Sequence, residues 1–196
     1  MSKALLHGKE RNGGRGYRIS LPGLVIILIV FAAVLPYAIP SGDPAFLVLA
    51  TLVLSGTALG LLAGPFRLET RVDAQSLMYG LLAAGAVGIS QMVLQFSALS
   101  SVRAVVIFAA VAEELAFRFG VQRFAERIMG PTIALVFQAG LFMLYHWVVY
   151  PGYSLSAAYP LIAGLVFGAV NTLSRDLTPS LLAHTAVNAL VAISFG

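Results

Sequence analysis

The sequence predicts an all-α, polytopic membrane protein, a bundle of about seven transmembrane helices with one amphipathic interfacial segment. The chain has 196 residues, of which 59% are hydrophobic and only 10% charged, and its mean hydropathy is +0.92. A soluble domain carries roughly 25% charged residues. The apolar residues also fall into continuous runs of about the 20 residues that an α-helix needs to cross a bilayer. We therefore expect a single transmembrane domain over residues 21–196.

Residues 1–20 form a predicted flexible, basic tail on the cytoplasmic side. Five of the chain's lysines and arginines lie here, separated by glycines, and positive charge retains a segment on the inner side of the membrane. The net charge of +4 is therefore a membrane-topology signal, and no nucleic-acid partner is expected. The chain has no cysteine, which excludes disulfides, thiolate zinc sites, iron–sulfur clusters and a catalytic thiol.

The first three predicted spans lie at about 22–39, 45–63 and 76–98. The first is interpreted as an uncleaved helix, because residues 36–40 carry prolines and a tyrosine where a signal peptidase requires small residues. The glycine–proline pair 64–65 ends the second span, and a polar loop follows at 66–75. In the third span, glycines are expected to allow close helix packing, and two glutamines are expected to bond to other helices or to line a substrate path. These residues are Gly80, Gly85, Gly88, Gln91 and Gln95.

The last four predicted spans lie at about 102–119, 132–149, 156–173 and 178–195. The fourth continues as an amphipathic stretch to Met129, where the glycine–proline pair 130–131 breaks it. In the sixth, Gly164 and Gly168 have the spacing of a close helix–helix contact. Aromatic residues near the end of the fifth span are expected to form an interfacial belt. They are Tyr145, Trp147 and Tyr150.

The positive charges test this count of spans. With the N-terminus inside, all of the 12 lysines and arginines except Arg103 fall on the cytoplasmic side. Such a bias is typical of a correctly assigned topology. The charges therefore predict a multi-pass protein with a cytoplasmic N-terminus and an outer C-terminus, and we expect it in a prokaryotic cell membrane.

Two adjacent carboxylates interrupt the fourth span. Charged side chains are rare within membranes and are usually functional there. Glu114 and Arg118 are four residues apart, so they are expected to form an ion pair on one face of the helix. Glu113 points about 100° away and has no partner on its own helix. We therefore expect Glu114 and Arg118 to be structural and Glu113 to be functional.

Three further polar residues lie at membrane depth on other helices. His146 is in the fifth span, and His184 and Asn188 lie one turn apart on the seventh. Taken singly, such residues are more often packing residues that bond to a neighbouring helix. Together with Glu113 they describe a hydrolytic site, in which a glutamate with a histidine takes a proton from water while a second histidine and an amide stabilise an oxyanion. Counted from the span boundaries, however, the two histidines differ in depth by about 10 Å.

Other interpretations stay open at this point. Two histidines and a glutamate also form a plausible catalytic zinc set with water as the fourth ligand, although no HExxH helix is present. A proton-coupled transporter would use the same residues as a relay, but no internal repeat of the kind that such proteins often carry is apparent. A non-catalytic membrane scaffold or immunity protein would keep the fold without needing Glu113.

Three ordered motifs resemble a known family. Residues 113–118 have the form EExxxR, residues 142–146 the form FxxxH, and residues 184–188 the form HxxxN. In this order, on successive apolar segments, they resemble the CAAX protease and bacteriocin-processing family of intramembrane endopeptidases, also called the ABI family. The resemblance covers about residues 105–192. Its eukaryotic members trim the last three residues from prenylated CAAX proteins.

The resemblance implies a glutamate-dependent protease that acts on a membrane protein or a lipidated peptide without a cofactor. Glu113, aided by His146, would activate water, and His184 and Asn188 would form the oxyanion hole. Glu114 and Arg118 would support the site. The chain is shorter than the eukaryotic members, so we do not expect recognition of a prenyl group to follow from the motifs.

Overall fold

The computed structural model describes residues 17–20, 44–69, 73–93, 109–149 and 158–194. The predicted first span, Gln95, Tyr150 and most of the basic tail lie outside these ranges. Within them the chain is a helical bundle with one small β-sheet, so the all-α prediction is right in class and misses only the sheet. The six helical elements labelled in the structure are α2 (Pro44–Leu62), α3 (Ala74–Val93), α5 (Arg123–Met129), α6 (Pro131–Val149), α7 (Ala158–Ser174) and α8 (Leu177–Ser194). They match the second, third, fifth, sixth and seventh predicted spans and the amphipathic stretch.

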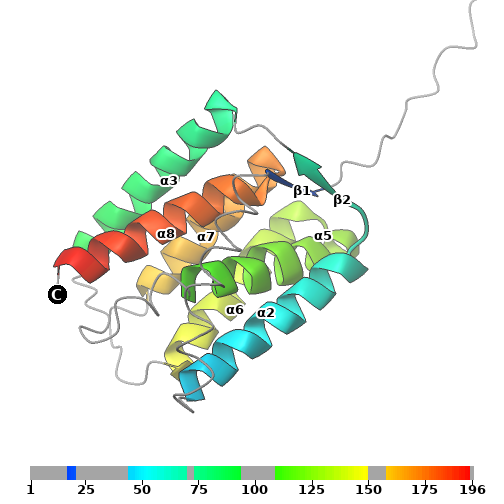
Figure 1. Cartoon of the computed structure of the whole chain (residues 1–196), viewed down its shortest axis with the longest axis horizontal. Helices are drawn as coiled ribbons and strands as arrows, with labels where there is room; N and C mark the ends of the chain where they lie inside the picture. The colour runs from blue at the N-terminus through cyan, green and yellow to red at the C-terminus, as the bar shows by residue number, and fades with distance from the viewer. Residues whose placement is uncertain (1–16, 21–43, 70–72, 94–108, 150–157, 195–196) are drawn as a thin grey trace, which may run out of the picture.

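The fourth predicted span contains an unusual helix. Residues 109–113 are α-helical and continue directly into a π-helix, η1 (Glu114–Gln122), which leads into α5. A π-helix bonds each N–H to the carbonyl five residues back, is rare, and occurs frequently at functional sites. This helix lies between α2 on one side and α8, α7 and α6 on the other, while α3 covers α8 on the opposite flank of the bundle (Figure 1).

Helices α2 and η1 meet with their backbones almost in contact. A methyl group at Gly56 would lie 2.3 Å from the Cα atom of Ala116, and one at Gly120 would lie 2.7 Å from the Cα atom of Gly56. Gly164 of α7 approaches Ala139 of α6 in the same way, as its spacing predicts. Of the three glycines of α3 predicted to allow packing, Gly80 meets the backbone of Pro179, whereas no atom of the described residues lies within 4 Å of a methyl group placed at Gly85 or Gly88.

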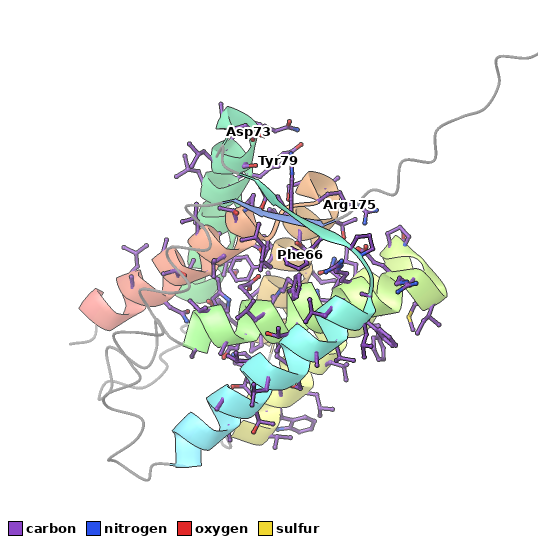
Figure 2. The ribbon with its side chains drawn as sticks, turned by 45° about the vertical axis from the view of Figure 1, so that its right-hand side comes forward. Phe66, Asp73, Tyr79 and Arg175 are labelled. Atoms are coloured by element: carbon purple, nitrogen blue, oxygen red, sulfur yellow. The ribbon has the colours of Figure 1, made fainter. Side chains whose placement is uncertain are left out.

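Two short strands occupy segments that the sequence predicts to be a tail and a loop. β1 (Tyr17–Ser20) pairs in parallel with β2 (Phe66–Glu69), so the prediction of a flexible tail is wrong for its last four residues. On its other side, Arg18 bridges to Asp176 in the turn between α7 and α8. Phe66 packs edge-on against Phe119 of η1, and Figure 2 shows it on β2 beside the helices. The sheet thus joins three distant parts of the chain at one end of the bundle.

Acidic side chains start the two helices next to the sheet. Asp73 accepts a hydrogen bond from the backbone N–H of Ser76 at 2.7 Å, and Asp176 accepts one from that of Thr178 at 2.9 Å. Both carboxylates also lie 3.9 Å from the guanidinium of Arg18. The hydrogen bonds from Ser76 lower the pKa of Asp73, whereas burial raises the pKa of Asp176.

Large apolar side chains cover the outside of the bundle. Leu81 of α3, Leu54 of α2 and Val148 of α6 are each more than 70% exposed. In the described residues, one helix is long and apolar enough to cross a membrane, Pro131–Val148, and three shorter apolar segments lie at Ala50–Leu62, Ala74–Ser90 and Ala158–Ser174. The seven-span count therefore remains a prediction.

Candidate active site

Glu113 lies at the junction where the α-helical turn becomes η1. It is the last residue before the π-helix begins, and only 2% of its surface is exposed. Its neighbour Glu114 and the arginine at position 118 are fully buried. Two carboxylates and a guanidinium inside an apolar bundle are costly to keep there, so each requires partners.

Both predicted histidines reach Glu113. Its Oε2 atom lies 3.8 Å from Nε2 of His146 on α6 and 3.6 Å from Nε2 of His184 on α8. The depth difference calculated from the span boundaries is therefore not present in the folded bundle, where three helices bring the side chains together. Both distances exceed the 2.7–3.2 Å of a direct hydrogen bond, so one water molecule can bond to the carboxylate and to an imidazole.

A second layer of contacts holds His184. Its Nδ1 atom lies 2.8 Å from Oε1 of Glu114, and the same oxygen lies 3.2 Å from Nη1 of Arg118. The predicted ion pair of Glu114 and Arg118 is thus present, and it extends to His184, which the spacing did not predict. The chain of contacts runs from Arg118 through Glu114 and His184 to Glu113.

These contacts fix which ring nitrogens carry hydrogen. Nδ1 of His146 lies 2.9 Å from the carbonyl oxygen of Phe142, which can only accept a hydrogen bond, so Nδ1 is the donor. Nδ1 of His184 likewise donates to the carboxylate of Glu114. In a neutral imidazole the other nitrogen then has a free lone pair. Both Nε2 atoms therefore face Glu113 as acceptors unless their ring gains a second proton.

Aromatic rings enclose this polar core. Phe167 stacks on His184 with ring centroids 4.8 Å apart, and Phe142 lies 4.4 Å from the ring of His146. The guanidinium of Arg118 lies over the Phe142 ring at 4.3 Å from its centroid. Such packing restricts the rotamers of both histidines and shields the ion pair from water, so the site is rigid and its electrostatic interactions are strong.

The aromatic residues predicted to form an interfacial belt take different positions. Tyr145 is partly buried against the hydrophobic core, and its hydroxyl group hydrogen-bonds Glu113. Trp147 is 59% exposed and keeps the surface position of a belt residue. Asn188 lies one turn beyond His184 on α8 and is partly exposed. The only sequence signal that could have linked Tyr145 to the active site was its place next to His146. That place does not distinguish a residue of an interfacial belt from a residue of the site.

Among the described residues, no group of three histidine, cysteine, aspartate or glutamate residues is arranged to hold a metal ion. The separations of 3.6 and 3.8 Å around Glu113 fit a carboxylate and imidazoles that share water.

Residues 95–190 match the family model described as Rce1-like, type II CAAX prenyl endopeptidase. The match includes all three motifs and the residues that meet at Glu113. The chain carries an Rce1-like domain. The resemblance seen in the motifs is thereby confirmed. No curated protein and no solved structure matched the chain.

The matched family is membrane-associated, and the match supports a protease-like function for residues 95–190. The Rce1-like domain begins before the π-helix and ends on α8, so it contains the whole constellation around Glu113. Helix α2 and the two strands lie before it and pack onto it.

Proposed function

We propose that the protein is a multi-pass intramembrane endopeptidase that hydrolyses a peptide bond of a membrane-associated or lipidated substrate with water activated by Glu113. The observation that carries the proposal is a buried carboxylate with the Nε2 atoms of two histidines within 4 Å. No packing requirement explains this costly arrangement, whereas water activation uses every group in it. The Rce1-like family match supports the same reaction class.

In the proposed mechanism, Glu113 accepts a proton from a water molecule that also bonds to Nε2 of His146. The resulting hydroxide adds to the carbonyl carbon of the scissile bond, and the π electrons move onto the carbonyl oxygen. When the tetrahedral intermediate collapses, the C=O bond re-forms and the C–N bond breaks. The proton held by Glu113 passes to the leaving nitrogen, so the carboxylate is regenerated.

His184 and Asn188 are proposed to stabilise the oxyanion. His184 can donate from Nε2 only as an imidazolium, because Nδ1 already donates to Glu114. The Glu114 carboxylate, at 2.8 Å, supplies the compensating negative charge. The amide of Asn188, one turn further along α8, is the second donor. Removing one such donor from a hydrolase costs about 100- to 1,000-fold in rate.

The parallel pairing of β1 with β2 supports the multi-pass topology. Paired strands lie on one side of a membrane, so the chain must cross an even number of times between residues 20 and 66. The predicted first span and α2 supply two crossings. The bridge from Arg18 to Asp176 would put the α7–α8 turn on that side as well, which would again require an even number of crossings. Four predicted spans, the third to the sixth, lie between β2 and that turn. The exposed apolar side chains of α2, α3 and α6 would then face lipid.

The proposal requires no metal ion, because the carboxylate and the two imidazoles can activate water and stabilise the oxyanion without one. A zinc-dependent mechanism is the alternative to be tested. The substrate class remains the broad one stated above, since the site residues act on the peptide bond rather than on a lipid group.

The decisive experiment is peptide cleavage by the purified full-length protein in liposomes. The substrate panel contains membrane-anchored peptides and both prenylated and unprenylated CAAX peptides. The variant Glu113→Gln should lose at least about 100-fold in kcat/KM, while Asp73→Asn, which makes the same chemical change at an exposed carboxylate, should retain it.

Three outcomes would contradict the mechanism. Loss of cleavage with a chelator, restored by zinc, would replace it with a metalloprotease. Full activity of Glu113→Gln would show that Glu113 is not the general base. If no peptide is cleaved but a proton flux across the liposome depends on Glu113, the transporter interpretation would take its place.

A further inference from the structure

Tyr145 lies within the FxxxH motif, at a position that the motif leaves unspecified. It precedes His146 on α6, and its hydroxyl hydrogen-bonds the Glu113 carboxylate. Its ring stands edge-on to His146, at 90° and 5.1 Å between centroids, and leans on Phe117 of η1 at 5.5 Å. Contacts on two sides therefore fix the direction in which the phenol points.

A hydrogen-bond donor at position 145 can make an interaction with Glu113 that the neutral histidines cannot make. Glu113, when ionised, can only accept hydrogen bonds, and the neutral forms of His146 and His184 present acceptor nitrogens to it. Neither ring can fix the direction of the carboxylate until His184 becomes the imidazolium that the proposed mechanism requires. A phenol is neutral, keeps its proton at physiological pH, and donates without being consumed in a proton transfer.

We propose that Tyr145 is a positioning residue, whose hydroxyl holds the Glu113 carboxylate with Oε2 turned toward the two imidazole Nε2 atoms. The role rests on the function proposed above, because it orients that reaction's general base. The hydroxyl bond keeps the carboxylate in one rotamer, while the two longer separations leave Oε2 able to bond to water. A base held in the reactive geometry acts faster than one that samples several.

The first test measures the contact itself, independently of catalysis. Infrared spectra are recorded on protein with ¹³C-carboxyl glutamate, and the Glu113 band is identified by its loss in Glu113→Gln. We expect Tyr145→Phe to move that band, since it removes only the hydroxyl. Tyr79→Phe is the matched control. Tyr79 lies on α3, where its hydroxyl accepts a hydrogen bond from Gln75 (Figure 2), so its variant should leave the band in place.

The second test separates positioning from substrate binding. With the best cleaved peptide, Tyr145→Phe should lower kcat about 10-fold, the typical loss for one hydrogen bond, and should leave KM within about twofold. Tyr79→Phe should match the wild type in both constants. A folded Tyr145→Phe protein with an unmoved Glu113 band would overturn the proposal. So would a variant with a moved band and an unchanged kcat.

The two proposals fail in different ways. If the wild type cleaves no peptide but the Glu113 band moves in Tyr145→Phe, the peptidase function is wrong and the positioning contact is right. If the wild type is active and Tyr145→Phe changes only KM, Tyr145 belongs to the substrate-binding surface and the positioning role is wrong.

Discussion

Replacing Glu114 by glutamine tests whether the buried ion pair serves the structure, the chemistry or both. Glu114 and Arg118 are fully buried, with 3.2 Å between Oε1 and Nη1, and Oε1 also receives the Nδ1–H of His184 at 2.8 Å. Glutamine keeps the size of the side chain and an oxygen that can accept from His184. The substitution therefore removes charge while leaving the shape of the site.

The expected cost in stability comes from the guanidinium that remains. A buried charge that loses its partner destabilises a protein by about 3–5 kcal/mol. Arg118 keeps its contact with the face of Phe142, so we expect the lower end of that range. In the double variant Glu114→Gln/Arg118→Met neither member of this ion pair is left without the other. Since replacing both partners of a buried pair is often nearly neutral, it should recover most of the loss.

Catalysis should respond differently from stability. Without the Glu114 charge, the imidazolium of His184 loses its counter-ion, so kcat should fall about 10- to 100-fold, equivalent to about 1.5–3 kcal/mol for a hydrogen bond to a charged group. The double variant should regain stability but not kcat. Unfolding is measured by circular dichroism in mixed micelles with increasing SDS, and cleavage in liposomes. If the double variant loses as much stability as the single variants Glu114→Gln and Arg118→Met lose together, the residues are not coupled and the reasoning fails.

Two further predictions concern the scaffold. Gly56→Ala should destabilise the protein by about 1–3 kcal/mol, because its methyl group overlaps the η1 backbone at Ala116. Gly85→Ala, which meets open space, is the control and should be neutral or slightly stabilising. Equal effects of these two variants would argue against the close α2–η1 contact. Asp73 contributes stability above its ordinary pKa of 3.8, and this is lost as the pH falls through its lowered pKa. Acid unfolding curves of Asp73→Asn should therefore show a smaller loss of stability on acidification than those of the wild type, and identical curves would refute this assignment.

The polar residues of the bundle predicted much of the site. Because buried charge is costly in an apolar segment, contact between Glu113, His146 and His184 was expected. The spacing of Glu114 and Arg118 was enough to predict their ion pair. The sequence did not predict that Glu114 also holds His184, because a contact across 70 residues leaves no local pattern. The same limit applies to β1, whose partner lies beyond α2.

The π-helix limits how well side-chain directions can be predicted from the sequence. Face assignments from sequence assume a constant 100° per residue, and η1 departs from that value over nine residues. The direction of every side chain after Glu113 on that helix therefore drifts from its predicted face. Tyr145 was missed for another reason: an aromatic residue near the end of an apolar helix has the same local pattern at a membrane interface and at a site. Only the packing of α6 against η1 distinguishes the two.

The bridge between Arg18 and Asp176 also has a consequence for biogenesis. On the ribosome, β2 can pair with β1 soon after it emerges, but Asp176 is synthesised about a hundred residues later. At a synthesis rate of about 5–20 residues per second, several seconds pass between the synthesis of β2 and that of Asp176. On the proposed topology, insertion of the chain is therefore separate in time from its final closure. Because His184 lies only eight residues after Asp176, the side chains around Glu113 come together with that closure, and we expect incompletely synthesised chains to lack activity.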